Sequence, residues 1–369
     1  MKFLHVIHSD KKFVKPAVGF IEECVNCGEH TIMYVNEKGK DSLILADSKL
    51  KQIEYYLNNR LDFVTSFKII KIMKQYDYIV FHSLYFRFVF RLIVCFHKSL
   101  LKKIVWIEFG NDLYIKPGFL RGLTYILTRI IANNCNSFVG IFEPDCEYFE
   151  RKYAKSNAKI FFAPYCGPEV PDFFVDRMVN NNIPLEKKKI SKEEVVIQIG
   201  HNGMRSLNHI KVLNTLRRFR NENIKILLIL NYGDSKKYRD RVQRYAEKCF
   251  PGKVKYLKNF LGEDEYYKVI DNVDICIFNT YRQAALANIN RMIWNNVKMY
   301  IPSNSVMFKF FKDNGAAVEK YEEIAIVSFE EFVNYPHNNS IDLEKYKKRY
   351  ISKEWREGSW NYIYERLNK

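Results

Sequence analysis

The chain alternates short apolar runs with amphipathic stretches, and this alternation constrains its fold more than any other feature. Short apolar runs fit buried strands, and apolar residues spaced three or four apart fit helices that cover a sheet. Such an order predicts a parallel sheet with helices on both faces. In the first half we expect strands at residues 3–8, 31–35, 42–46, 78–82, 104–107, 137–141 and 159–163, and helices at 17–27, 64–74, 84–96, 119–132 and 144–153.

Residues 164–193 interrupt the alternation, because they are rich in proline and end in a charged run, which is typical of an interdomain linker. The alternation then resumes, with strands expected at 195–199, 224–230, 254–257, 273–278 and 298–301 and helices at 207–219, 236–249, 263–270 and 284–294. We therefore expect a first α/β domain at 1–170, a linker at 171–193, a second α/β domain at 194–350, and a helix at 351–369 that packs back on the first domain.

The net charge of +17 favours an anionic partner such as nucleic acid, anionic lipid or a phosphorylated small molecule. The charge is spread along the chain, and no zinc-finger, RRM or helix-turn-helix pattern is present, which argues against nucleic acid. Residues 84–103 combine apolar positions with Arg87, Arg91 and Lys98, so we expect a helix that lies on an anionic membrane surface. The alternative is a buried helix that covers the sheet and has a basic outer edge.

The segment 195–210 (VVIQIGHNGMRSLNHI) predicts a buried strand, a tight turn and a helix start. Backbone N–H groups at a helix start bind anions, and an arginine in the same turn can bond two phosphate oxygens. We expect a diphosphate to be bound here; the alternative is an ordinary turn with Ser206 as the helix cap. The candidate donor-binding residues of this turn are Gly200, Asn202, Gly203, Arg205, Ser206 and His209.

A second polar loop follows the strand expected at 273–278 and contains Tyr281, Arg282 and Gln283, with Asn288 on the helix behind it. Arginine and amide side chains suit a diphosphate and its base. Tyr281 could stack on the nucleobase, although a loop aromatic is often only packing.

The first half places acids and a histidine after its strands: Asp10, His82, Glu108 and Asp112. Any of them could take a proton from an acceptor hydroxyl. Each has a structural alternative as well: Asp112 and Asp10 as turn residues, Glu108 as a solvent-facing residue, and His82 as a hydrogen-bonded structural histidine.

Acids in one half and arginines in the other fit a nucleotide-sugar transferase of the GT-B type, which has two doubly wound Rossmann-like α/β domains that face a cleft. The chain contains no D-x-D sequence, the usual cation-holding motif of metal-dependent transferases. We therefore expect neither a metal ion nor a cofactor, and we expect Arg205 and Arg282 to stabilise the leaving diphosphate.

Four segments resemble, in the same order, segments of the TDP-N-acetylfucosamine:lipid II N-acetylfucosaminyltransferase family, also called the 4-alpha-L-fucosyltransferase family. They are residues 4–10 (LHVIHSD), 110–114 (GNDLY), 199–210 (IGHNGMRSLNHI) and 282–283 (RQ). The resemblance extends from the first strand to about residue 312, and the glycine-arginine-serine-histidine turn is its most specific part. The chain differs at Ala285 and Ala287, where the family has glycines.

The resemblance implies a GT-B fold and transfer of an acetamido-dideoxyhexose from a dTDP donor to a sugar on undecaprenyl diphosphate. It also implies a peripheral protein at the cytoplasmic face of the bacterial inner membrane, in the synthesis of enterobacterial common antigen. Position by position, Gly200, Gly203, Arg205, Ser206 and His209 match the donor turn. Gly110, Asp112 and Tyr114 match an acceptor-side loop, which also contains Asn111.

Other functions remain open from the residues alone. They are a sugar-nucleotide epimerase or hydrolase of the same architecture, a basic nucleic-acid-binding protein, and an inactive scaffold in a glycan assembly complex. The expected partners of the transferase are a nucleotide-sugar donor, a lipid-linked glycan acceptor and an anionic membrane surface.

Overall fold

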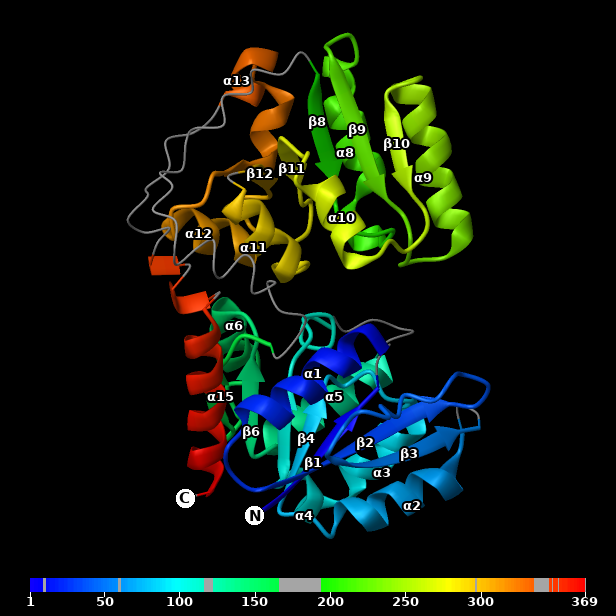
Figure 1. Cartoon of the computed structure of the whole chain (residues 1–369), viewed down its shortest axis with the longest axis vertical. Coiled ribbons are helices and arrows are strands. Elements are labelled where there is room, and N and C mark those ends of the chain that lie inside the picture. Colours follow the sequence, from blue (N-terminus) through cyan, green and yellow to red (C-terminus); the bar gives the residue numbers. More distant parts are fainter. Residues whose placement is uncertain are drawn as a thin grey trace. The chain divides into compact units, whose positions relative to one another are not determined.

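The computed structural model describes residues 1–8, 11–58, 61–115, 122–165, 194–295, 297–334, 345–346, 348–350 and 352–368. The chain forms two compact units (Figure 1). The first consists of residues 1–173 and 350–369, and the second of residues 174–349. Each unit is an α/β structure built on one parallel sheet. The predicted linker, residues 171–193, lies outside the described residues.

The first unit contains a seven-stranded sheet in the order β3-β2-β1-β4-β5-β6-β7, and every neighbouring pair is parallel. Its strands are β1 (Lys2–Ile7), β2 (Glu29–Glu37), β3 (Lys51–Leu57), β4 (Tyr78–His82), β5 (Ile104–Ile107), β6 (Ser137–Gly140) and β7 (Lys159–Phe162). The central strands are buried on both faces, which explains why they appear in the sequence as continuous apolar runs.

Helices cover both faces of this sheet. One face packs against α2 (Phe63–Met73), α3 (Phe88–Phe96), α4 (Lys98–Leu101), α5 (Gly122–Asn134) and α6 (Glu143–Lys152). The other face packs against α1 (Lys11–Cys24) and the C-terminal helix α15 (Lys353–Asn368). The indole N–H of Trp360 donates to the carbonyl oxygen of Pro164 at 2.8 Å, and the Tyr78 hydroxyl donates to that of Leu367 at 2.7 Å. The C-terminal helix is thus part of the first unit (Figure 1).

The second unit contains a six-stranded parallel sheet in the order β10-β9-β8-β11-β12-β13. Its strands are β8 (Val195–Ile199), β9 (Ile224–Ile229), β10 (Val254–Leu257), β11 (Ile275–Ile277), β12 (Lys298–Ile301) and β13 (Val318–Lys320). Its α-helices are α8 (His209–Leu216), α9 (Lys236–Cys249), α10 (Glu263–Ile270), α11 (Leu286–Trp294), α12 (Val306–Asp313) and α13 (Phe329–Val333). Short 3-10 turns lie at Arg205–Leu207, Arg217–Phe219 and Tyr321–Ala325.

The strand expected at residues 42–46 is wrong, because this segment has no regular structure and the edge strand is β3 instead. Side chains of β3 bond the segment: Glu54 accepts from the Leu43 N–H, and Gln52 accepts from the Leu45 N–H, both at 2.9 Å. A half-exposed edge strand carries polar residues, and β3 (KQIEYYL) therefore lacks the continuous apolar run that would predict a strand.

The helix expected at 84–96 begins only at Phe88. Its burial favours the alternative interpretation, a helix that covers the sheet, over a helix that lies on a membrane surface. Val89, Phe90, Ile93 and Val94 are buried against the sheet. α3 is therefore mainly a sheet-covering helix, and the only large apolar side chain that it exposes is Phe96 at its end. Within the described residues, no helix is both long enough and apolar enough to cross a bilayer.

Candidate functional site

Each sheet reverses its strand order at one place, and ligands of such sheets bind beyond the carboxyl ends of the strands there. In the second unit the reversal lies between β8 and β11, and in the first between β1 and β4. The donor-binding candidates follow β8 and β11, whereas Asp10 and His82 follow β1 and β4. Asp10 lies outside the described residues.

The turn after β8 packs against the turn after β9 through glycines. The Gly203 N–H donates to the Tyr232 carbonyl oxygen at 2.7 Å, and Gly203 pairs with Gly233 in an isolated bridge. Gly233 has φ +123°, and a Cβ there would lie 2.6 Å from the Gly203 carbonyl carbon. Gly200 has φ +63° and leaves room for Leu207 and His209. A Cβ at Gly203 would lie 2.7 Å from Arg239 Cδ and 3.0 Å from the Tyr232 carbonyl oxygen, so close packing favours glycine at both positions of the predicted turn.

Arg205 lies on this turn with its side chain 64% exposed. Its backbone N–H donates to Asp234 Oδ2 at 2.7 Å, and its Nε lies 3.6 Å from Asp234 Oδ1. The guanidinium lies over the Tyr238 ring, 4.9 Å from the centroid. Arg205 is thus oriented by an acid and an aromatic ring while most of the side chain faces solvent. Sequence analysis found the arginine but neither of the residues that orient it.

The helix after this turn begins later than expected. Residues Arg205–Leu207 form a 3-10 turn, and α8 starts at His209 with Asn208 as its N-cap at φ +52°. Ser206 is therefore not the cap, and the proposed alternative role for it is wrong. The Asn208 side-chain amide donates to the Asn279 carbonyl oxygen at 3.0 Å. This bond joins the loop after β8 to the loop after β11.

His209 and Asn202 are buried parts of the same turn. Burial lowers the pKa of His209 to about 4, its Nδ1 lies 3.3 Å from the Tyr238 hydroxyl, and its Nε2 faces Gly200. Asn202 Oδ1 accepts from the Met204 N–H at 2.9 Å, as in an Asx turn. These two residues shape the turn from inside.

The loop after β11 presents the second set of candidates. Tyr281 is 53% exposed, Arg282 is half-buried, and its Nη1 donates to the Gln283 carbonyl oxygen at 2.9 Å. Gln283 is buried, and the Asn288 amide donates to the Tyr266 hydroxyl at 3.0 Å. Tyr281 is therefore the most accessible of these residues, Arg282 and Asn288 are partly accessible to a ligand, and Gln283 is set into the unit.

Ala285 follows these residues as the N-cap of α11 at φ +57°. A side chain strains this left-handed conformation, which glycine adopts freely. The alanine therefore stores backbone strain beside the candidate site.

In the first unit the loop after β5 is closed by Asp112, which is only 1% exposed. Its carboxylate accepts from the N–H groups of Leu84 and Phe109 and from Trp106 Nε1, each at 2.9 Å. The carboxylate thus ties together the loops after β4 and β5. This geometry favours the turn-residue interpretation of Asp112 over that of a general base.

Glu108 is fully buried, so the expectation that it could face solvent is wrong. It hydrogen-bonds to Asp145 and accepts from the N–H of Gly110, which has φ +73°. Burial, with the charges of Asp145 and Asp112, raises the pKa of Glu108 well above its usual value. Tyr114 donates to Asp145 Oδ1 at 2.5 Å. The acids therefore brace this loop from inside.

Asn111 is the exposed member of the loop after β5. Gly110 and Tyr114 bend the loop and anchor it, because Gly110 has φ +73° and Tyr114 donates to Asp145. The loop thus presents Asn111 to solvent, and the side chains around it hold its shape.

His82 ends β4 as the last residue of a buried strand. Its Nδ1 lies 3.3 Å from the Tyr165 hydroxyl, and its Nε2 lies 3.0 Å from His5 Nδ1. Burial lowers the pKa of His82 to about 3, so the ring is neutral near pH 7. One of its two nitrogens then carries no proton and accepts a hydrogen bond. The next residue, Ser83, has φ +78° and is buried. Strained backbone of this kind is concentrated at functional sites.

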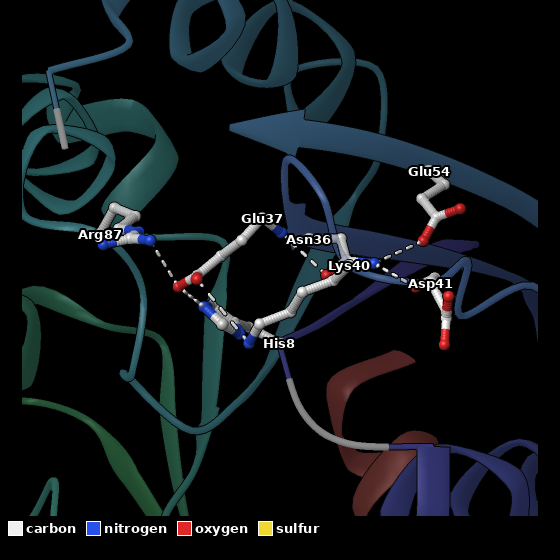
Figure 2. A network of polar contacts seen from close by, with 7 residues as sticks. All are labelled: His8, Asn36, Glu37, Lys40, Asp41, Glu54 and Arg87. Carbon is white, nitrogen blue, oxygen red and sulfur yellow. Dashed lines mark hydrogen bonds and ion pairs between the residues drawn. The ribbon is translucent and has the colours of Figure 1, made fainter. Parts of the chain in front are cut away.

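A polar cluster lies at the carboxyl ends of β1 and β2, next to the start of α3 (Figure 2). Arg87 Nη2 bonds Glu37 Oε1 at 2.7 Å, and His8 Nε2 lies 3.9 Å from the same oxygen. Lys40 approaches the other Glu37 oxygen at 3.7 Å. Glu37 thus holds three cationic or polar groups beside β1. It was not among the predicted site residues, because the strand expected at 31–35 extends to Glu37 and only the sheet brings its carboxylate next to His8 and Arg87.

The fold is that of the GT-B glycosyltransferases. Solved structures with this architecture include a glycosyltransferase from Rickettsia africae, with a TM-score of 0.67 at 12% identity, covering 100% of this chain and 98% of that one. A Thermosynechococcus elongatus sucrose-phosphate synthase matches at 0.67 and 11%, covering 100% and 99%. Anabaena HepE, solved with UDP and glucose, matches at 0.60 and 10%, covering 100% and 95%.

The sequence pattern of the 4-alpha-L-fucosyltransferase family, glycosyl transferase group 56, matches residues 22–329. The chain belongs to this family, and the resemblance stated from its sequence is confirmed. No curated protein matches the chain.

Proposed function

We propose that the protein transfers an acetamido-deoxyhexose or a related deoxyhexose from a dTDP- or UDP-linked donor to a sugar on a polyprenyl-diphosphate lipid carrier, in bacterial surface polysaccharide synthesis. The observation that carries the donor half is the joined pair of loops after β8 and β11. They share the Asn208–Asn279 bond and offer Arg205, Tyr281 and Arg282 to solvent. Structures with the same fold bind UDP-glucose in Anabaena HepE and UDP in Staphylococcus aureus MnaA.

Two arginines suit a leaving diphosphate because guanidinium groups bond phosphate oxygens in a bidentate manner. Asp234 holds Arg205 at the turn and must release part of it when phosphate binds, since both compete for the same donors. We propose that this stabilisation replaces a metal ion. Tyr281 is next to Arg282 on the loop after β11, and we propose that its ring stacks on the nucleobase.

The acceptor half of the proposal is assigned to His82 and Tyr165. Asp112 and Glu108 are buried and hydrogen-bonded, whereas the neutral imidazole of His82 has an acceptor nitrogen at Tyr165. In this mechanism the acceptor hydroxyl loses its proton towards His82 while its oxygen bonds the anomeric carbon and the nucleotide diphosphate leaves.

A polyprenyl-linked acceptor stays in the bilayer, so the first unit would work at an anionic membrane surface. α2 supports this, because it exposes Phe63, Val64 and Phe67, at 46%, 68% and 54%. Lys68 and Lys71 are exposed on the following turns of the same helix. Exposed rings beside lysines are typical of helices that lie in the headgroup layer. We propose this surface in place of α3, at the cytoplasmic face of the inner membrane.

Two measurements test the proposal. Calorimetry with dTDP, UDP, GDP and CMP should show selective binding of dTDP or UDP, and Arg205→Ala should weaken it. Transfer should then require a detergent-dispersed polyprenyl-diphosphate glycan. Turnover of the nucleotide sugar without acceptor would favour an epimerase or hydrolase. Binding to RNA or DNA at physiological salt, with no nucleotide affinity, would favour the nucleic-acid alternative.

A further inference from the structure

Three histidines form a continuous hydrogen-bonded chain across the sheet of the first unit. His30 Nδ1 lies 2.8 Å from His5 Nε2, and His5 Nδ1 lies 3.0 Å from His82 Nε2. One end of the chain is the Cys27 carbonyl oxygen, 2.8 Å from His30 Nε2. The other end is the Tyr165 hydroxyl at His82 Nδ1.

The strand register explains how the rings meet. His30 is level with Phe3 of β1, and His82 is level with Ile7. His5 lies two residues from each, so all three side chains project from the same face of neighbouring strands along one diagonal. The chain therefore runs from the amino-terminal end of β2 to the carboxyl end of β4, where ligands of such sheets bind.

The proton positions in this chain follow from one fixed end. A carbonyl oxygen only accepts, so His30 Nε2 must donate to Cys27. In a neutral ring His30 Nδ1 then accepts, so His5 Nε2 donates to it. By the same step His82 Nε2 donates to His5 Nδ1, and His82 Nδ1 accepts from the Tyr165 hydroxyl.

Burial keeps the His5 and His82 rings neutral. Burial lowers the pKa of His5 well below its usual value and that of His82 to about 3. His30 is only partly buried; burial lowers its pKa, the Cys27 carbonyl raises it, and the Met1 ammonium lowers it further. The Phe3 ring stacks on His30 with centroids 5.0 Å apart, and stacked rings attract a cation. A positive charge is therefore tolerated best on His30.

We propose that His82, His5 and His30 are a proton relay that receives the proton of the acceptor hydroxyl through Tyr165 and delivers the charge to His30. This inference rests on the proposed function. The hydroxyl proton moves to the Tyr165 oxygen as the Tyr165 proton moves to His82 Nδ1. The His82 Nε2 proton moves to His5 Nδ1, and the His5 Nε2 proton moves to His30 Nδ1. After product release the same shifts run in reverse, and the Tyr165 hydroxyl passes the extra proton to a solvent water molecule, which restores the neutral chain.

In this scheme His5 and His30 are positioning residues, and they act on the reaction only through His82. They make Nδ1 the basic nitrogen of His82, and they move the charge from the buried His82 and His5 rings to the partly buried His30. Partners that orient metal-bound histidines contribute about tenfold to a hundredfold to activity, and we expect an effect at the lower end of that range here.

The first test needs no substrate. Long-range proton–nitrogen NMR of the histidine-labelled full chain at neutral pH should show His5, His30 and His82 as Nε2–H tautomers. A protonated His82, or a proton on its Nδ1, would overturn the relay. Because this measurement is made on the unsubstituted protein without donor or acceptor, it is independent of whether sugar transfer occurs.

The second test is His30→Phe, which removes the acceptor for His5 and keeps an aromatic ring. We expect mixed tautomers at His82, a fall in kcat of about tenfold, and an unchanged KM for the donor. The matched control is Tyr34→Phe, which removes a buried hydroxyl bonded to Gln52 on the same face and should leave both readouts unchanged. Unchanged kcat and unchanged His82 tautomer in His30→Phe would contradict the proposal. If the tautomers are as described but no sugar transfer occurs with any donor, the proposed function is wrong. The proton positions along His30, His5 and His82 are then still supported.

Discussion

The two strand-reversal sites of this protein are built in opposite ways. After β8 the second unit presents an exposed arginine on glycine-rich backbone, and after β11 it presents an exposed tyrosine. After β4 and β5 the first unit has buried titratable side chains that are either neutral or hydrogen-bonded. The first arrangement suits capture of a charged ligand from water, and the second suits movement of a proton in a low dielectric.

This contrast predicts that the two sites control different kinetic constants. His82→Ala should lower kcat by about 10³-fold, because a positioned base contributes roughly 10²–10⁴-fold. Donor affinity, measured by calorimetry with the nucleotide, should stay the same. A variant that loses nucleotide binding instead would show that the two sites are not separate in function.

The close contact of the two glycine turns gives the next largest effect. Gly233→Ala should cost about 3 kcal/mol of stability, because a Cβ would meet backbone at 2.6 Å and φ is +123°. Denaturant unfolding measures this. Gly262→Ala is the control, because nothing lies within 4 Å of a Cβ there, and its stability should change by less than about 0.5 kcal/mol. Equal effects at both positions would refute the packing argument.

Arg205→Ala should lower turnover by about 10²-fold if the guanidinium stabilises the leaving diphosphate. Nucleotide affinity should fall as well, in contrast to His82→Ala. Arg244→Ala, an exposed arginine on α9, removes the same charge and should have little effect. Near-normal turnover in Arg205→Ala would remove this residue from the mechanism.

Both units should lose stability in acid, since the folded-state pKa values of His82 and His209 are lowered to about 3 and about 4. Below pH 6.5 the unfolded chain binds protons that the folded chain does not, so stability falls as pH decreases towards those values. Each of these two histidines should lower the free energy of unfolding by about 2–3 kcal/mol as the pH falls from 6.5 to 4.5. The raised pKa of Glu108 acts in the opposite direction. Thermal unfolding of His209→Gln should show a shallower pH dependence than the unsubstituted chain, and an equal slope would contradict this origin.

The smallest effect concerns backbone strain beside the second site. Ala285→Gly should stabilise the unit by up to about 1 kcal/mol, because φ +57° is unfavourable for alanine, although the greater flexibility of glycine in the unfolded chain offsets part of this. The melting temperature measures the change. A lower value would mean that the alanine methyl packs usefully.

Several elements were predicted with their boundaries from the sequence, among them β8, α9, β10, α10 and β12. Most of them are buried apolar runs or strongly amphipathic helices, and β10 (VKYL) is a short apolar segment interrupted by one lysine. Such patterns depend only on the residues of the segment itself. The prediction missed β3, whose pairing is visible only in the sheet. It also missed α12 and β13, which lie in a stretch that the sequence analysis left unassigned.

The candidate residues divide in the same way. Arg205 and Arg282 could be found because a cation in a strand-to-helix turn is a local signal. The surroundings of Glu108 and the partners of His82 could not, because Asp145, His5, His30 and Tyr165 come from distant parts of the chain. The one available signal was the placement of His5 and His82 at inward positions of apolar strands.

The sequence alone determined the two α/β halves, the family and the residue types of the donor turn, because periodicity and short motifs are local properties. Only the tertiary structure decided which polar groups are buried, which bond one another and which face solvent. Strand order and register decide these neighbours, and a pKa or a tautomer depends on those neighbours. The direction of the histidine chain is therefore a property of the assembled sheet.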